Sequence, residues 1–133
     1  LSEIRKGPAR ARPEVWNWWV GMEHQELFLS VLTLGEIRKA IERLPSKDAS
    51  QTLFLERWLD EVKHVFGARL IEVNVRVAER WGQLQAIRPL PEVDALLAAS
   101  VLEHDLTLVT RNEADFAGLG IRVLNPFQSS TSL

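Results

Sequence analysis

The chain has 133 residues and a mass of 15.1 kDa, which suits one domain built around a single hydrophobic core. A net charge of −2 and a pI near 5.9 exclude a general attraction to nucleic acid, so phosphate contacts would need a local basic patch or a bound metal ion. The absence of cysteine excludes disulfides and thiolate zinc sites, and with no membrane-spanning apolar run and no signal peptide we expect a cytoplasmic protein without a membrane partner.

The first half of the chain begins with what resembles the end of a helix. Residues 1–7 look like a helix tail that Gly7 closes, so we expect a strand before the first residue given. A basic loop follows, and Pro13 opens the next helix. The predicted elements are then a helix over 14–22, a strand over 27–32, a helix from its cap Thr33 to Leu44 and an amphipathic helix over 49–66.

In the second half, short apolar runs alternate with amphipathic segments. They predict strands over 70–73, 106–109 and 121–124, and helices over 75–86, 92–104 and 113–117. Strands that alternate with helices are typical of a parallel sheet covered by helices. We therefore predict an α/β fold, a three-layer α/β/α domain with a mostly parallel central sheet over residues 1–127, and a frayed tail over 128–133.

Three acidic residues recur near the predicted starts of helices. Glu36 and Asp115 each follow a strand-like run closely, and Asp94 opens an alanine-rich helix. Because the carboxyl ends of parallel strands share one edge of a sheet, acids far apart in sequence can converge there. Their mutual repulsion would favour a bound cation, and Mg²⁺ and Mn²⁺ prefer such oxygen ligands.

A structural interpretation of the same acids competes with this one. Thr33 with Glu36, and Asn112 with Asp115, each match a capping box, in which the acid bonds back to the amide of the capping residue. An acid at position 94 would also favour the positive end of its helix. On this interpretation the chain is a non-catalytic α/β binding domain whose acids only cap helices.

Three segments together resemble a known family. They are Ser30-Val31-Leu32-Thr33-Leu34-Gly35-Glu36-Ile37, Leu90-Pro91-Glu92-Val93-Asp94-Ala95-Leu96-Leu97-Ala98-Ala99 and Leu108-Val109-Thr110-Arg111-Asn112-Glu113-Ala114-Asp115-Phe116. Their order and spacing are similar to the hallmark segments of PIN-domain proteins, closest to the VapC/FitB-type toxins of bacterial toxin–antitoxin pairs. The ending Val123-Leu124-Asn125-Pro126-Phe127 is also similar. The resemblance covers nearly the whole chain and implies a PIN-like fold.

The resemblance implies a Mg²⁺- or Mn²⁺-dependent endoribonuclease, the toxin of a type II toxin–antitoxin pair, that cleaves RNA phosphodiesters by metal-activated water. Glu36, Asp94 and Asp115 match the family's metal-binding acids, with Asn112 and Thr110 beside them as further catalytic-site residues. The implied partners are an RNA substrate, with transfer RNA as one candidate, an antitoxin with a DNA-binding domain, and a second copy of the chain. From the sequence we further predict that Arg111 faces a substrate phosphate.

One departure from the family concerns its first acid. That residue precedes a Leu-Ser-Glu-like helix, so here it would lie about four residues before Leu1. The segment between Ala86 and Pro89 also looks a few residues short. Two alternatives remain beside the toxin, namely a nuclease of RNA processing and, less well supported, a phosphotransfer receiver domain, which would need a lysine at the end of the last strands.

Overall fold

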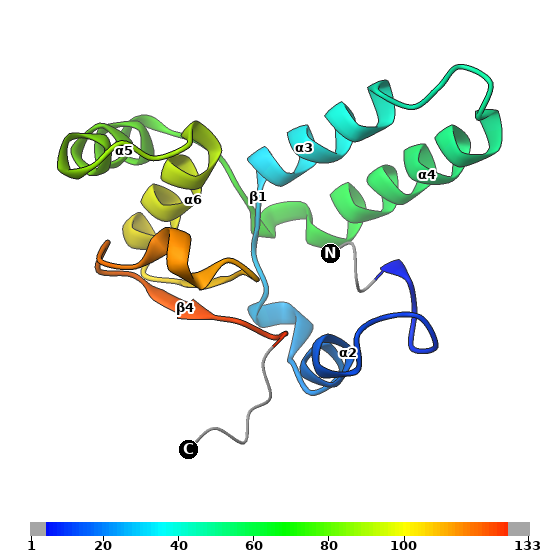
Figure 1. The fold of residues 1–133 in the computed structure, drawn as a ribbon, viewed down its shortest axis with the longest axis horizontal. Helices are drawn as coiled ribbons and strands as arrows, with labels where there is room; N and C mark the ends of the chain where they lie inside the picture. Colours follow the sequence, from blue (N-terminus) through cyan, green and yellow to red (C-terminus); the bar gives the residue numbers. More distant parts are fainter. Residues whose placement is uncertain (1–4, 128–133) are drawn as a thin grey trace.

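A computed structural model describes residues 5–127 and confirms the alternation of strands and helices (Figure 1). The predicted helix tail lies largely outside the described residues, although Arg5 is helical and Gly7 has the positive φ of 82° typical of a helix-ending glycine. The predicted frayed tail over 128–133 also lies outside them. In chain order the elements are α2 (Pro13–Val20), η1 (His24–Glu26), β1 (Leu29–Ser30), α3 (Val31–Glu42), α4 (Ala49–Phe66), η2 (Gly67–Arg69), β2 (Leu70–Ile71), α5 (Val75–Ile87), α6 (Glu92–Glu103), β3 (Thr107–Val109), η3 (Glu113–Phe116) and β4 (Arg122–Leu124).

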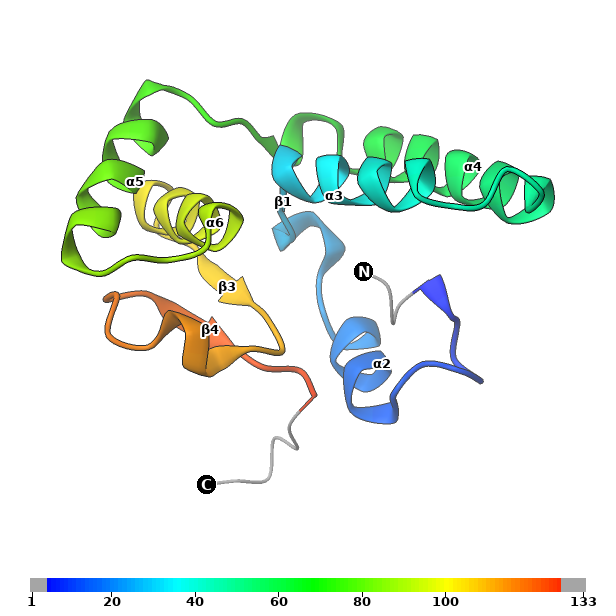
Figure 2. The ribbon, with the colours of Figure 1, turned by 45° about the horizontal axis from the view of Figure 1, so that its top comes forward.

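The strands of the described chain pair in parallel, but as two separate pairs. β1 pairs with β2, with Leu29 opposite Leu70, and β3 pairs with β4, with Leu108 opposite Val123. The parallel pairing was predicted, whereas the single continuous sheet is not present within residues 5–127. Figure 2 shows β1 apart from β3 and β4. A cavity of about 750 Å³ lies between the two pairs and is lined by residues of all four strands.

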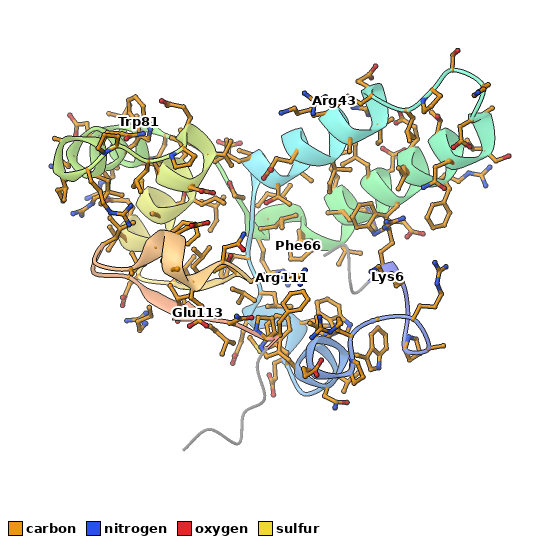
Figure 3. All side chains as sticks on the ribbon, viewed as in Figure 1. Lys6, Arg43, Phe66, Trp81, Arg111 and Glu113 are labelled. Atoms are coloured by element: carbon orange, nitrogen blue, oxygen red, sulfur yellow. The ribbon has the colours of Figure 1, made fainter. Side chains whose placement is uncertain are left out.

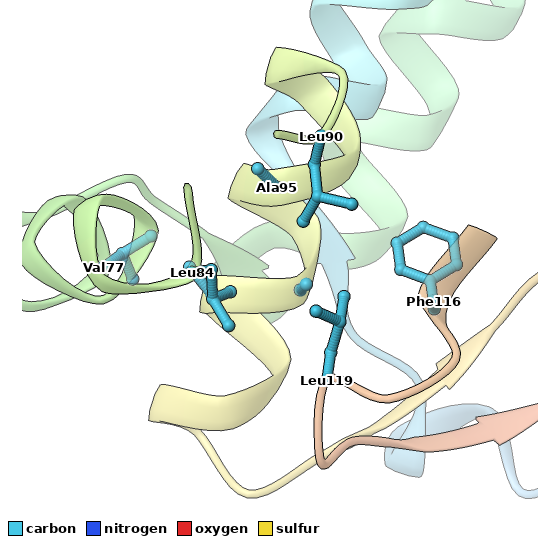
Figure 4. Close-up of a cluster of buried hydrophobic side chains, with 8 residues drawn as sticks. Val77, Leu84, Leu90, Ala95, Phe116 and Leu119 are labelled. Carbon is cyan, nitrogen blue, oxygen red and sulfur yellow. The ribbon is translucent and has the colours of Figure 1, made fainter. Parts of the chain in front are cut away.

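The larger core joins α5, α6 and the C-terminal elements. Ala95, Ala98 and Ala99 on α6 are completely buried, and their small side chains let the neighbouring elements approach closely. Larger side chains pack around this alanine surface (Figure 4), namely Val77, Leu84, Leu90, Phe116 and Leu119. Because α6 and η3 share this core, the start of α6 and the residues of η3 are held at fixed positions.

A second, smaller core holds α3 against α4 as an antiparallel pair of helices. Ile41, Leu55 and Leu59 are buried between them. Arg38 of α3 donates from both terminal nitrogens to the carboxylate of Glu56 on α4, at 2.5 and 3.0 Å. Figure 1 shows this pair of helices apart from α5 and α6, with β1 running between the two groups. Within residues 5–127 no helix is long and apolar enough to cross a membrane.

The start of α3 differs from the prediction. Ser30 is the capping residue, because its hydroxyl accepts a hydrogen bond from the backbone N–H of Leu32 at 3.1 Å. The helix therefore begins at Val31, and the predicted cap at Thr33 was wrong. The strand ends at Ser30 although the apolar run continues, because the backbone amides after Ser30 are satisfied within the capped helix. As a result Glu36 lies in the second turn of α3 rather than in the first.

Candidate active site

Asp94 and Asp115 are brought together by the packing of α6 against η3. Asp94 lies in the first turn of α6, and Asp115 lies in η3, whose Phe116 is anchored in the core shared with α6. Burial raises the pKa of the Asp94 carboxyl, and the nearby negative charge of Asp115 raises it further. Two of the three predicted acids therefore interact across more than twenty residues of sequence, as the sheet-edge argument expected.

No basic side chain forms an ion pair with these acids in the described part of the chain. Among residues 5–127, Glu36, Asp94 and Asp115 form no ion pair with a lysine, arginine or histidine, although six other acidic residues do. A pair of neighbouring carboxylates without a counter-charge is the arrangement that a cation stabilises. Mg²⁺ typically takes one or two protein carboxylates and completes its shell with waters, so the Asp94–Asp115 pair fits such an ion.

The capping interpretation of the acids is wrong at two of the three positions. Ser30, and not Thr33, caps α3, so Glu36 has no capping box to complete. At η3 the side chain of Asn112 makes no capping hydrogen bond. The backbone N–H of Asn112, which Asp115 would accept from in a capping box, donates instead to Thr110 Oγ1 at 3.1 Å. Asp94 retains only the general preference of an acid for a helix start. Helix capping therefore does not explain the presence of Glu36 or Asp115.

Glu36 lies at a different place from the aspartate pair. It is exposed, and within residues 5–127 no group of three or more acidic or histidine side chains is gathered closely enough to hold a metal ion. Thr33, one turn before Glu36, and Leu97, one turn after Asp94, both line the cavity between the strand pairs. Residues three apart share a helix face, so Glu36 and Asp94 each lie on a helix face that borders this cavity.

The segment between β3 and η3 is held by a network of hydrogen bonds. Thr110 donates its N–H to the Leu124 carbonyl at 3.0 Å, and its hydroxyl accepts from Asn112. Asn125 donates from Nδ2 to the Arg111 carbonyl and to Glu113 Oε1, each at 3.2 Å. Thr110 and Asn112 thus lie on one hydrogen-bonded turn. The contributions of Glu113 and Asn125 were not predicted, and the Asn-Pro pair that follows the last strand was the available signal.

Arg111 lies at the wall of the cavity. Its guanidinium stacks over the Phe127 ring at 4.7 Å from the centroid, and Arg12 approaches the same ring at 5.5 Å. Figure 3 shows Arg111 near the middle of the molecule and Glu113 on the same segment. The stacking holds the guanidinium in place by a cation–π contact, so a basic group stands on the turn that carries Asn112.

The model of one protein family matches most of this chain. The PIN domain family matches residues 9–120. This span includes the elements from α2 to η3 and all of the predicted site residues, and β4 lies just beyond it. The chain belongs to the PIN-domain family.

Relatives of this PIN domain are of nearly the same length. The VapC ribonuclease Y4jK of Sinorhizobium fredii is 25% identical over 134 residues, which cover 96% of this chain and 93% of that protein. The toxin FitB of Neisseria gonorrhoeae is 24% identical over 133 residues, which cover 95% of each. These matches extend over the whole PIN domain rather than over its motifs alone.

Solved structures confirm the PIN fold. A structure of FitAB bound to an IR36 DNA fragment superposes with a TM-score of 0.82 at 19% identity, covering 93% of this chain and 90% of that one. A toxin–antitoxin complex from Klebsiella pneumoniae gives a TM-score of 0.66 at 24% identity, covering 90% and 88%. Despite the low identity, the arrangement of helices and strands is that of the PIN fold.

The raised pKa of Asp94 predicts how Asp94→Asn changes the stability of this PIN domain. The folded state holds the Asp94 proton more tightly than the unfolded state does, so the free energy of unfolding falls as the pH rises through this pKa range. At pH 7 we expect Asp94→Asn to raise the free energy of unfolding by about 0.5 kcal/mol, or Tm by roughly 2 °C. Thermal unfolding in a metal-free buffer between pH 3 and pH 8 measures this difference, which should vanish at the acid end.

The control for this experiment is Glu92→Gln, which removes an exposed carboxylate from the same turn of α6. Added Mn²⁺ should raise the Tm of the wild-type protein and leave Asp94→Asn unchanged, because only the wild type then retains both carboxylates. A lower Tm for Asp94→Asn than for Glu92→Gln in metal-free buffer would instead support a purely helix-stabilising role for Asp94.

Proposed function

We propose that this PIN domain is a Mg²⁺- or Mn²⁺-dependent endoribonuclease and that it acts as the toxin of a type II toxin–antitoxin pair. The observation that carries the proposal is the uncompensated pair of carboxylates, Asp94 and Asp115, at the packed junction of α6 and η3. The names of the relatives supply the reaction class, since one is a VapC ribonuclease and another is a toxin.

In the proposed site Asp94 and Asp115 hold the cation, and Glu36 on α3 acts on it through a bound water, because within residues 5–127 no three acids are close enough to hold an ion directly. A bound Mg²⁺ or Mn²⁺ would supply an acidified water and a counter-charge for the leaving oxygen of the phosphodiester. Asn112 and Thr110 fix the turn after β3, so that the backbone carrying Asp115 keeps its position during the reaction. With a neutral amide at position 112, the acidic charge of the site comes from the carboxylates alone.

Arg111 is the residue that we propose to contact the RNA backbone. Its guanidinium is already held over Phe127, so little side-chain entropy is lost when it donates to a phosphate oxygen. The net charge of −2 makes such a local contact necessary, because the domain as a whole does not attract RNA.

The proposed partners are an RNA substrate, a cognate antitoxin with a DNA-binding domain and a second copy of the chain. The similar chain in FitAB was solved with a DNA fragment, and another similar chain was solved within a toxin–antitoxin complex. A small neighbouring reading frame that encodes a DNA-binding protein would support the toxin over a nuclease of RNA processing. Coexpression should then yield a stable complex of the two chains.

The direct test is cleavage of RNA by the purified full-length protein. We expect internal cuts in the presence of Mn²⁺ or Mg²⁺, and a loss of at least about 100-fold when a chelator removes the metal, which returns on adding Mn²⁺. Products are resolved on denaturing gels with transfer RNA and an unstructured RNA as substrates. Cleavage that persists unchanged in excess chelator would contradict a metal-dependent mechanism, and no cleavage of either RNA would contradict the nuclease itself.

A further inference from the structure

The connection between α5 and α6 is held by a side chain that makes two hydrogen bonds to one main-chain residue. Gln85 in the last turn of α5 donates from Nε2 to the Leu90 carbonyl at 3.0 Å and accepts from the Leu90 N–H at 2.9 Å. Leu90 is buried in the larger core, and Pro91 after it occupies the position just before the first residue of α6. The amide of Gln85 therefore fixes the residues that lead directly into the turn bearing Asp94.

The same connection is also tied to η3. Arg88, which follows the last residue of α5, donates from Nη2 to the carbonyl of Asp115 at 3.1 Å and to the carbonyl of Ala117 at 3.0 Å. Both acceptors lie at the end of η3, where carbonyl groups lack partners within the helix. A single guanidinium nitrogen thus bridges two main-chain groups, one of them belonging to the residue that carries the second carboxylate.

These two side chains link the backbones of both acids to one short segment. Gln85 sets the approach to Asp94 through Leu90, and Arg88 sets the position of Asp115 through its carbonyl. Neither side chain is needed to cover the core, since Arg88 is only partly buried and Gln85 is likewise partly exposed. From the sequence, the segment between Ala86 and Pro89 was notable only for looking a few residues short compared with the family.

We propose that Arg88 is a positioning residue of this PIN domain, which sets the separation of the Asp94 and Asp115 carboxylates by tying the α5–α6 connection to η3. The inference rests on the proposed function as far as catalysis is concerned. The claim that Arg88 holds η3 in position does not depend on the proposed function. Arg88 acts through the main chain, because its donor is engaged with carbonyl groups.

The test uses the full-length variants Arg88→Met and Arg88→Lys, with Arg76→Met as the matched control. Arg76 lies on α5, is highly exposed and pairs only with Glu103 among the described residues. We expect Arg88→Met to lower kcat and the affinity for Mn²⁺ at least about tenfold, with KM for RNA little changed, as for other outer-shell partners of metal ligands. Arg88→Lys keeps a donor and should recover part of both.

Amide hydrogen exchange over residues 113–117 provides a readout that is independent of activity. Arg88→Met should speed the exchange of these amides and leave the exchange rates of α3 and α4 unchanged. Arg76→Met should not change the exchange rate over residues 113–117. If Arg88→Met matches Arg76→Met in kcat and in Mn²⁺ affinity, the positioning role is wrong even when exchange is faster. If the wild-type protein cleaves no RNA, the proposed function is wrong. The inference about Arg88 is then tested by Mn²⁺ affinity and amide exchange alone, and it is wrong if Arg88→Met changes neither of them.

Discussion

We expect Asp94→Asn to slow RNA cleavage by the full-length protein about 10³-fold, because a carboxylate that holds the metal supplies several kcal/mol of transition-state stabilisation. The substitution keeps the shape of the side chain and removes its charge. The same variant should gain thermal stability in metal-free buffer, because burial and the negative charge of Asp115 both disfavour the ionised form of Asp94. Lost activity together with gained stability is the pattern of a functional residue, because a residue that serves only the fold loses both.

Single-turnover cleavage rates at saturating Mn²⁺ measure this effect, with Glu92→Gln as the control. Glu92 is an exposed acid in the same turn of α6, so its loss should leave the rate within about twofold. Glu36→Gln should also slow cleavage, although Glu36 stands apart from the aspartate pair in the described chain. Rates for Glu36→Gln and Asp94→Asn that both equal the wild-type rate would exclude the catalytic assignment.

The helices were largely predictable from local pattern. The bounds of α4, Ala49–Phe66, agree with the prediction at both ends, because an 18-residue amphipathic repeat ends at Gly67 with a positive φ of 45°. The start of α3 was displaced by three residues, since Ser30 and Thr33 are both good caps and only the folded chain shows which hydroxyl reaches a free amide. Local chemistry thus limits where a helix begins but does not always select one residue.

The pairing of strands depends on contacts that the sequence pattern does not contain. Apolar runs predicted each strand, and the parallel direction followed from the helices between them. Which strands become neighbours is decided by long-range packing: Leu108 of β3 and Val123 of β4 pack on the larger core, whereas no residue of β1 or β2 belongs to either core of the described chain. The separation into two pairs within residues 5–127 therefore could not be predicted from periodicity.

The candidate site shows the same division. Glu36, Asp94 and Asp115 were predicted to converge, and within residues 5–127 the packing of α6 against η3 brings the two aspartates together while Glu36 stays apart. Gln85, Arg88 and Asn125 were not predicted, because each bonds mainly to main-chain carbonyls or amides of distant residues. Such bonds need a side chain of the right reach and leave no repeating pattern. Family resemblance finds the acids, whereas the residues that position them require the folded structure.

Phe116→Ala is the substitution for which we expect the largest loss of stability, about 3 to 5 kcal/mol. The Phe116 ring is 5% exposed and packs in the core with Leu90 and Ala95, next to Asp115 in sequence (Figure 4). Its removal leaves a cavity and frees η3 from α6. Urea unfolding at 25 °C measures the loss, and cleavage below the unfolding transition should also fall because Asp115 is no longer held near Asp94.

Two variants separate the loss of packing from the loss of an aromatic ring. Phe54→Ala removes a ring that is 52% exposed on α4, so it should cost less than about 1 kcal/mol. Phe116→Leu keeps most of the buried volume and should cost about 1 kcal/mol with cleavage largely retained. If Phe116→Ala is no more destabilising than Phe54→Ala, η3 is not docked on the core. The Asp94–Asp115 pair would then lack the rigid support that a metal site needs, because both carboxylates must hold their separation without the ion.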